Sequence, residues 1–169
     1  MTKPGIRVRR RYEQSKIDRL FQRADKQQEA GNLKSAFRLY LACAKAGDPG
    51  CQNNLGNFYR DGIGVKPNRE RALYWYRQAY RRGLEGAASN VGVLFRDEKN
   101  LKQALAWFER AGDGDADLAI ANMYLQANDT AKAIRYLKRA RKSDCISEAS
   151  REDAERLLNS LTAKSRPRK

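Results

Sequence analysis

Residues 51–83 read CQNNLGNFYRDGIGVKPNRERALYWYRQAYRRG, and this stretch decides the fold. Each of its two halves places small and large apolar residues at i, i+4 and i+7, which puts them on one stripe of a helix. A segment with two glycines, residues 62–64, lies between the halves, and Gly83 closes the second half. The stretch therefore predicts two helices joined by a glycine-containing turn.

The two glycines of this segment also raise a second interpretation, a phosphate-binding loop. A dinucleotide-binding fingerprint needs a third glycine and a preceding strand, whereas here Pro67 follows and a helical pattern precedes. The Gly-Lys-Ser or Gly-Lys-Thr of a Walker loop is also missing. We therefore interpret Gly62 and Gly64 as turn residues with backbone angles that other residues resist.

The two helical patterns recur along the chain, which indicates a repeat protein. The first helix of a unit carries an apolar, a small and an aromatic residue: Leu55, Gly56 and Tyr59; Val91, Gly92 and Phe95; Ile120, Ala121 and Tyr124. The second helix carries a large residue at Trp75, Trp107 and Tyr136, with Leu39 in the matching place. One such pair cannot bury its own apolar face, so the pairs must stack.

These repeats predict an all-α fold, an α–α superhelix (right-handed solenoid) of about four helix-turn-helix repeats with a C-terminal capping helix. We expect a basic N-terminal tail (1–13), a single helical repeat domain (14–163) and a basic C-terminal tail (164–169). The units lie near 14–48, 50–84, 86–113 and 115–143, with the cap at 147–163. Gly47, Gly83 and Gly112 stand where helix C-caps are expected, and Asn32, Asn68, Asn100 and Asp129 where N-caps are expected.

The reactive residues of the chain argue against an enzyme. It has no histidine, which removes Ser-His-Asp and Cys-His catalysis and histidine-ligated metals. Its three cysteines, Cys43, Cys51 and Cys145, are an odd number without CxxC spacing, so they predict neither a disulfide framework nor a zinc site. We interpret Cys43 and Cys51 as core thiols. The sequence thus predicts no catalytic residue, metal, cofactor or small-molecule substrate.

The short apolar runs of the chain indicate where in the cell the protein is located. None approaches the roughly 20 residues that a membrane-spanning helix needs, and the N-terminal residues lack the apolar core of a secretory signal. We expect a cytoplasmic protein without a membrane partner.

Residues 51–83 resemble a Sel-one-like repeat, a relative of the tetratricopeptide repeat with a longer internal loop. The matching residues are Leu55, Gly56, Tyr59, Gly62, Gly64, Val65, Ala72, Trp75, Tyr76, Ala79 and Gly83. Asn68 and Cys51 depart from the pattern, and the third and fourth units lack the glycine loop, but the resemblance extends over residues 14–143. It implies an α-solenoid that binds proteins or peptides, often as an adaptor, and it supplies no catalytic motif.

The first helices of such stacks line the concave side, and their residues off the packing stripe are expected to point into it. The predicted partner-binding residues are Asn53, Asn57, Arg60, Ser89, Val93, Arg96, Asn122 and Gln126. Asparagine and arginine could bind the backbone amides and acidic groups of an extended peptide. A plainly solvated face is the alternative, and the sequence does not decide between them.

The formal net charge of +15 suggests a polyanionic or acidic partner. The predicted basic surface comprises Arg7, Arg9, Arg10, Arg11, Lys138, Arg139, Arg141, Lys142, Arg166 and Arg168. The first hypothesis is a non-catalytic adaptor for an acidic protein or peptide, as a regulator, an assembly factor or a toxin-neutralising (immunity) partner. The alternative is an RNA- or DNA-associated protein that uses its basic tails and surface arginines.

Overall fold

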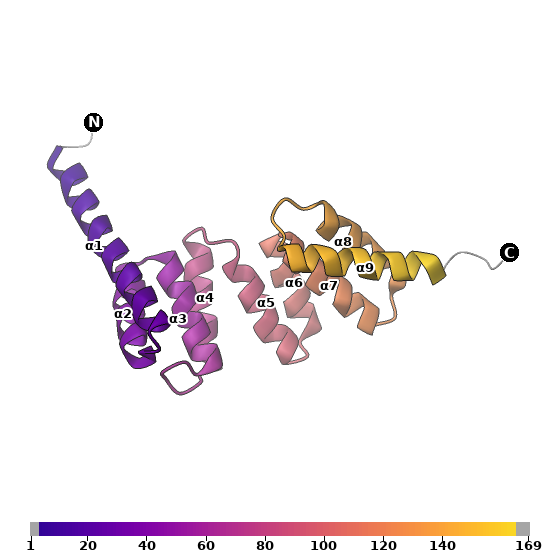
Figure 1. Ribbon diagram of the computed structural model, residues 1–169, viewed down its shortest axis with the longest axis horizontal. Coiled ribbons are helices and arrows are strands. Elements are labelled where there is room, and N and C mark those ends of the chain that lie inside the picture. Colours follow the sequence, from indigo (N-terminus) through magenta and orange to yellow (C-terminus); the bar gives the residue numbers. More distant parts are fainter. Residues whose placement is uncertain (1–3, 165–169) are drawn as a thin grey trace. The chain divides into compact units, whose positions relative to one another are not determined.

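The computed structural model describes the backbone of residues 4–164 and the side chains of residues 15–163. Over that range the chain forms nine α-helices and no strand (Figure 1). They are α1 (Pro4–Glu29), α2 (Leu33–Ala46), α3 (Pro49–Asp61), α4 (Arg69–Arg81), α5 (Ala87–Asp97), α6 (Leu101–Ala111), α7 (Gly114–Gln126), α8 (Thr130–Lys142) and α9 (Glu148–Lys164). Four helix pairs followed by a last helix confirm the predicted all-α repeat fold.

The contacts within the chain divide it into two compact units, Met1–Ala87 and Ala88–Lys169. The first unit contains α1 to α4, and the second contains α6 to α9 with nearly all of α5. Because α1 begins at Pro4, the backbone of residues 4–13 belongs to the first helix. A single helical repeat domain over residues 14–163 stays a prediction.

Large aromatic side chains form the core of the first unit. Tyr40 from α2, Phe58 from α3 and Tyr76 from α4 are each at most 1% exposed. The rings of Tyr40 and Phe58 pack edge to face with their centroids 5.2 Å apart. Gly56 lets α3 approach α4, because a Cβ atom at Gly56 would lie 2.5 Å from the Tyr76 ring. The small and aromatic positions of the repeat therefore work as a pair.

A disulfide bond joins Cys43 in α2 to Cys51 in α3, with the two Cα atoms 5.8 Å apart. The prediction of two thiols is wrong in this respect, although both residues are fully buried in the core as expected. Their spacing in sequence does not show that the end of α2 and the start of α3 bring the two sulfur atoms together. Nearby, the Nε2 atom of Gln52 donates to the carbonyl oxygen of Ala44 at 3.1 Å. Both contacts link the first repeat to the second.

The glycine loop of the second repeat also contacts the first repeat. Gly62 and Gly64 have φ angles of +71° and +66°, which confirms that they are turn residues. A Cβ atom at Gly64 would lie 2.7 Å from the carbonyl carbon and oxygen of Leu33, at the start of α2. Only glycine fits this close approach of two backbones.

Most of the predicted helix caps are confirmed. Asn68, Asn100 and Asp129 accept hydrogen bonds from backbone N–H groups in the first turns of α4, α6 and α8. Gly47 and Gly112 cap the ends of α2 and α6, and Gly83 follows the cap residue Arg82. Asn32 is the exception: it precedes α2 but accepts no capping bond, and its side chain donates to Gln27 instead.

The second unit repeats the same packing with shorter connections. Gly92 lets α5 approach α6, because a Cβ atom there would lie 2.8 Å from the Phe108 ring. Lys99 and Asn128, each with a φ of 59°, turn the chain between paired helices where the second repeat has its glycine loop. The predicted cap helix, α9, packs on α7 and α8 and buries Ala154 and Leu158.

Among the described residues, no helix combines the length and the apolar character needed to cross a lipid bilayer.

Candidate functional site

A small polar pocket of about 250 Å³ lies in the first unit. We refer to it as the polar pocket; its lining residues are Asp25, Gln28, Tyr40, Asn54, Asn57, Phe58, Arg60, Asp61 and Ile63. Helices α1, α2 and α3 and the glycine loop all contribute to it. Two predicted site residues, Asn57 and Arg60, meet in this pocket, whereas Asn53 is half-buried on α3 outside the lining.

Two buried tyrosines orient the polar side chains of the pocket. The hydroxyl of Tyr76 donates to Oδ1 of Asn57 at 2.7 Å, and the hydroxyl of Tyr40 donates to Asp25. Burial raises the pKa of Tyr76 to about 12. Burial, followed by the hydrogen bond to Asp25, also raises the pKa of Tyr40. Both phenols therefore remain donors at neutral pH, and the side-chain nitrogen of Asn57 is free of the Tyr76 bond and can donate to a ligand.

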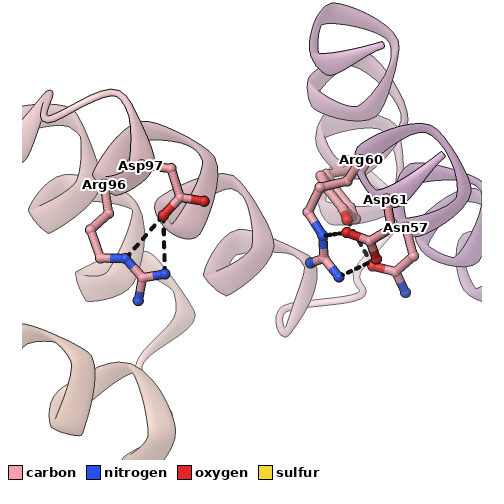
Figure 2. A network of polar contacts seen from close by, with 6 residues as sticks. Asn57, Arg60, Asp61, Arg96 and Asp97 are labelled. Atoms are coloured by element: carbon pink, nitrogen blue, oxygen red, sulfur yellow. Dashed lines mark hydrogen bonds and ion pairs between the residues drawn. The ribbon is translucent and has the colours of Figure 1, made fainter. Parts of the chain in front are cut away.

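The positive charge of Arg60 is balanced within the pocket, as Figure 2 shows. Its Nε and Nη2 atoms donate to the two carboxylate oxygens of Asp61, both at 2.7 Å. Hydrogen bonding from Arg60 lowers the pKa of Asp61, although partial burial opposes the shift. Since Asp25 adds a second carboxylate, the pocket is rich in amides and has no excess of positive charge.

Asp25, Gln28 and Asn54 line the pocket although the sequence does not select them. Asn54 does carry a signal, because it lies at i, i+3 and i+7 spacing with Asn57 and Asp61 on α3. Asp25 and Gln28 lie on α1, whose sequence lacks the first-helix pattern of the repeat. No alignment of repeats could have selected them.

Two of the predicted residues of the second unit already have partners within the protein. The Oγ atom of Ser89 donates to Oδ2 of Asp113 at 3.3 Å, and Asp113 is the N-cap of α7. Arg96 pairs with Asp97 at 3.1 Å, in the same arrangement of adjacent residues as Arg60 and Asp61 (Figure 2). These contacts reduce the capacity of Ser89 and Arg96 to bind an acidic ligand.

The other predicted residues of this unit differ in exposure. Val93 is half-buried on α5, and Asn122 and Gln126 are exposed on α7. Asn122 and Gln126 are therefore accessible to a partner, as the inner-face prediction requires.

One residue of the predicted basic surface has a structural role. Arg139 forms an ion pair with Asp117 at 3.2 Å and lies over the Tyr136 ring at 5.1 Å. Burial raises the pKa of Asp117, and the positive charge of Arg139 opposes that shift. The remaining cations of this cluster, Lys138, Arg141 and Lys142, are exposed on α8.

The predicted basic residues near the ends of the chain lie outside the described side chains. They are Arg7, Arg9, Arg10, Arg11, Arg166 and Arg168.

Cys43, Asp48 and Cys51 place their sulfur and carboxylate atoms within 4.8 Å of one another. With both sulfurs in a disulfide, this group offers a metal only the carboxylate of Asp48. That carboxylate also accepts from the N–H of Cys51 as the N-cap of α3.

The stacked helix pairs and their surface pocket define the chain as an α-helical repeat protein. The sequence profile of the Sel1 repeat matches residues 49–84, 87–115 and 116–145, which together are more than half of the chain. The chain therefore belongs to the Sel1 repeat family, as the resemblance of residues 51–83 indicates. Proteins of this family are generally protein-interaction modules.

Two curated relatives share part of their length with this chain. A sel1-like repeat-containing protein of Acanthamoeba polyphaga mimivirus is 28% identical over 86 residues, or 49% of this chain and 16% of that protein. Chitin synthase regulatory factor 3 of Schizosaccharomyces pombe is 24% identical over 110 residues, or 62% of this chain and 12% of that protein. The chain thus spans less than a fifth of the length of either relative.

Two solved structures have a similar fold. A Sel1 repeat protein from Oxalobacter formigenes aligns with a TM-score of 0.70 and 25% identity, over 90% of this chain and 64% of that one. A protective antigen of uropathogenic Escherichia coli with an SLR fold aligns with a TM-score of 0.65 and 20% identity, over 78% of this chain and 29% of that one. Both support the helical repeat architecture.

Proposed function

We propose that this chain is a non-catalytic protein-interaction module, an adaptor that binds an acidic protein or peptide. Service as a regulator, an assembly factor or a toxin-neutralising partner would be a specific form of this function. Family membership supports the interaction, and the net charge of +15 supports an acidic partner.

The polar pocket is the observation that carries the proposal. Gln28, Asn54 and Asn57 offer amide donors and acceptors that match the backbone of an extended peptide. The volume of about 250 Å³ is below the roughly 300–1,000 Å³ of typical small-molecule sites. A pocket of this size and chemistry suits a short stretch of a protein partner.

The partner's acidic groups need cations outside this pocket, because Arg60 and Arg96 are paired with neighbouring aspartates. Exposed lysine and arginine side chains elsewhere in the described part of the chain can supply them. Charge-assisted hydrogen bonds to such side chains are stronger than neutral ones.

The variant Asn57→Asp tests the pocket. It keeps the acceptor for Tyr76 but replaces the amide donor with a carboxylate, so the fold should be retained. We expect the complex with the native partner, captured by the full chain after nuclease treatment, to weaken about tenfold, because each 1.4 kcal/mol is a factor of ten. Asn159→Asp, on the exposed side of α9, makes the same chemical change elsewhere and should have no effect. If both variants bind the native partner equally well, the polar pocket is not part of the binding site.

Association with RNA or DNA is the second candidate, favoured by the exposed cations Lys138, Arg141 and Lys142. Such binding would fall steeply with salt, since each phosphate contact releases a counterion. Nuclease treatment of the captured complex separates the two candidates, because a protein partner held directly survives it.

The cytoplasmic location stays a prediction, and the Cys43–Cys51 disulfide favours an oxidising compartment over it. Disulfides are rare in cytosolic proteins, whose thiols are kept reduced. Alkylation of the chain in intact cells, followed by mass spectrometry, decides the matter: two added groups on these cysteines would support the cytoplasm.

A further inference from the structure

A second depression, of about 530 Å³, lies between α1 and α2. We refer to it as the basic groove; its lining residues are Arg23, Lys26, Gln27, Ser35, Arg38 and Leu39. At the 3.6 residues per turn of an α-helix, Arg23, Lys26 and Gln27 lie on one side of α1. Asp25 and Gln28, which line the polar pocket, lie on the opposite side. The groove is therefore a separate site.

The charge of the groove is uncompensated. Arg23, Lys26 and Arg38 are exposed, and the lining residues in the described part of the chain include no carboxylate. None of the three forms an ion pair with any residue in the described part of the chain. This differs from the polar pocket, where Asp61 balances Arg60. Three unpaired cations around one depression attract anionic groups.

One lining residue of the groove departs from the repeat pattern. Leu39 stands at the position that Trp75, Trp107 and Tyr136 occupy in the other second helices. A leucine is smaller than these aromatic residues and, half-buried, it forms an apolar floor between the cations. The groove therefore combines an apolar contact with a cationic rim.

The start of α2 does not provide the backbone donors of a phosphate cradle. The N–H groups of Leu33 and Ser35 already donate to the carbonyl oxygens of Gly31 and Asn32, both at 2.9 Å. What the groove offers is long cationic side chains above an apolar floor. That combination matches a peptide with carboxylate and apolar side chains better than it matches a phosphate group.

We propose that the basic groove binds an acidic, amphipathic segment of a protein partner. Carboxylates of that segment pair with Arg23, Lys26 and Arg38, and an apolar side chain packs on Leu39. The inference rests on the proposed function and adds to it the place where the acidic part of the partner docks.

The test uses the full chain and a short fluorescent peptide of repeated Glu-Glu-Leu triplets, with binding followed by anisotropy. Arg23→Glu with Arg38→Glu should weaken binding about a hundredfold, because two attractive contacts become repulsive. Lys138→Glu with Arg141→Glu changes the net charge equally on α8 and should weaken it less than about threefold. If the two double variants lose the same affinity for the peptide, net charge alone determines binding. That result would contradict binding in the basic groove.

A second variant tests the shape of the groove at constant charge. Leu39→Trp restores the residue type of the other repeats and should fill the floor, with binding about tenfold weaker. Circular dichroism and thermal unfolding check that each variant is folded, and Leu39→Phe replaces Leu39→Trp if the larger ring destabilises the unit. If the folded Leu39→Trp or Leu39→Phe variant binds the peptide as tightly as the wild type, the proposal is contradicted.

Two competitors test the chemical class of the ligand. Tripolyphosphate or a single-stranded oligonucleotide that displaces the peptide at lower concentration than the unlabelled peptide itself would overturn the acidic-segment proposal. A peptide with glutamine in place of glutamate should not bind.

The outcomes for the groove and for the proposed function are separable. In one outcome, the double variant Arg23→Glu with Arg38→Glu no longer binds the acidic peptide, while Asn57→Asp still captures the native partner as the wild type does. This outcome would support the basic groove and reject a role for the polar pocket. The opposite pattern would retain the pocket and reject the groove.

Discussion

The two units use the same helix-pair packing but differ in how neighbouring repeats are joined. In the first unit, a disulfide joins α2 to α3, and the glycine loop of the second repeat packs closely against the start of α2. In the second unit, short turns at Lys99 and Asn128 replace that loop, and α9 covers α7 and α8. The core positions thus define a repeat, whereas the connections decide how firmly adjacent repeats are joined.

The difference matters for function because both candidate binding sites lie in the first unit. The polar pocket uses side chains of α1, α2 and α3 and one residue of the glycine loop, Ile63. The basic groove uses α1 and α2. A pocket assembled from several helices needs them at fixed positions, and the disulfide and the loop supply that constraint.

Each unit contains one tryptophan, which allows the comparison to be measured. Trp75 lies in α4 and Trp107 in α6. Single-tryptophan chains, made with Trp107→Phe or Trp75→Phe, report the urea unfolding of each unit by fluorescence.

The largest expected effect comes from Gly64→Ala. A Cβ atom there meets the backbone of Leu33, and the φ of +66° is unfavourable for alanine. We expect a loss of about 3 kcal/mol in the unfolding free energy reported by Trp75. Gly31→Ala is the matched control: its φ is +75° but the space around it is open, so it should cost only about 1 kcal/mol. Equal losses would show that the loop does not hold α2.

Removal of the disulfide should have the next largest effect. Cys43→Ala with Cys51→Ala opens a loop with a sequence separation of 8 residues. The expected loss is about 2 to 3 kcal/mol, reported more by Trp75 than by Trp107. The exposed, free Cys145 provides the control variant Cys145→Ala, which should leave stability unchanged. An equal shift of both tryptophan signals would contradict separate reinforcement of the first unit.

In the second unit, Asp117→Asn should slightly stabilise the protein at neutral pH, by about 1 kcal/mol or less. Burial raises the pKa of Asp117, so the folded state binds its proton more tightly than the unfolded state. The buried, charged carboxylate of Asp117 therefore destabilises the wild-type fold. This destabilisation is absent below the ordinary aspartate pKa and develops as pH rises through the folded-state pKa. Urea unfolding at several pH values should show the advantage of the variant disappearing in acid. A variant less stable than the wild type at neutral pH would mean that the Arg139 pair outweighs burial.

The smallest effects belong to the exposed arginine–aspartate pairs. Asp61→Asn and Asp97→Asn should each cost less than about 0.5 kcal/mol, since exposed pairs contribute little. The pKa of Asp61 is lowered, so its contribution is present above the ordinary value of 3.8 and is lost as pH falls through the folded-state pKa. Thermal unfolding of the variants at neutral and acidic pH measures this contribution to stability. A large loss of stability at neutral pH would contradict the small contribution expected of these pairs.

The sequence predicts the helices well because the repeat signal is local. Gly56 and Tyr76 show the reason: their spacing recurs as Gly92 and Phe108, and each pair packs as expected. The same helical spacing predicts Asn57 and Arg60 as site residues, and both line the polar pocket. The packing of Gly56 on Tyr76 and of Gly92 on Phe108 lies within one repeat in each case.

Features that lie outside the repeat pattern could not be predicted in the same way. The disulfide depends on how the end of α2 meets the start of α3. The neutralisation of Arg60 depends on the rotamers of two adjacent side chains. The basic groove depends on α1, which lacks the repeat pattern, and on a leucine whose effect is visible only once α1 covers α2.

Hydrogen exchange of the full chain, with and without saturating Glu-Glu-Leu peptide, tests most directly whether the first unit carries the partner site. The account predicts slower exchange in residues 23–39, which span the basic groove, and unchanged exchange in α8. Slowing confined to α8, or no slowing anywhere, would contradict it.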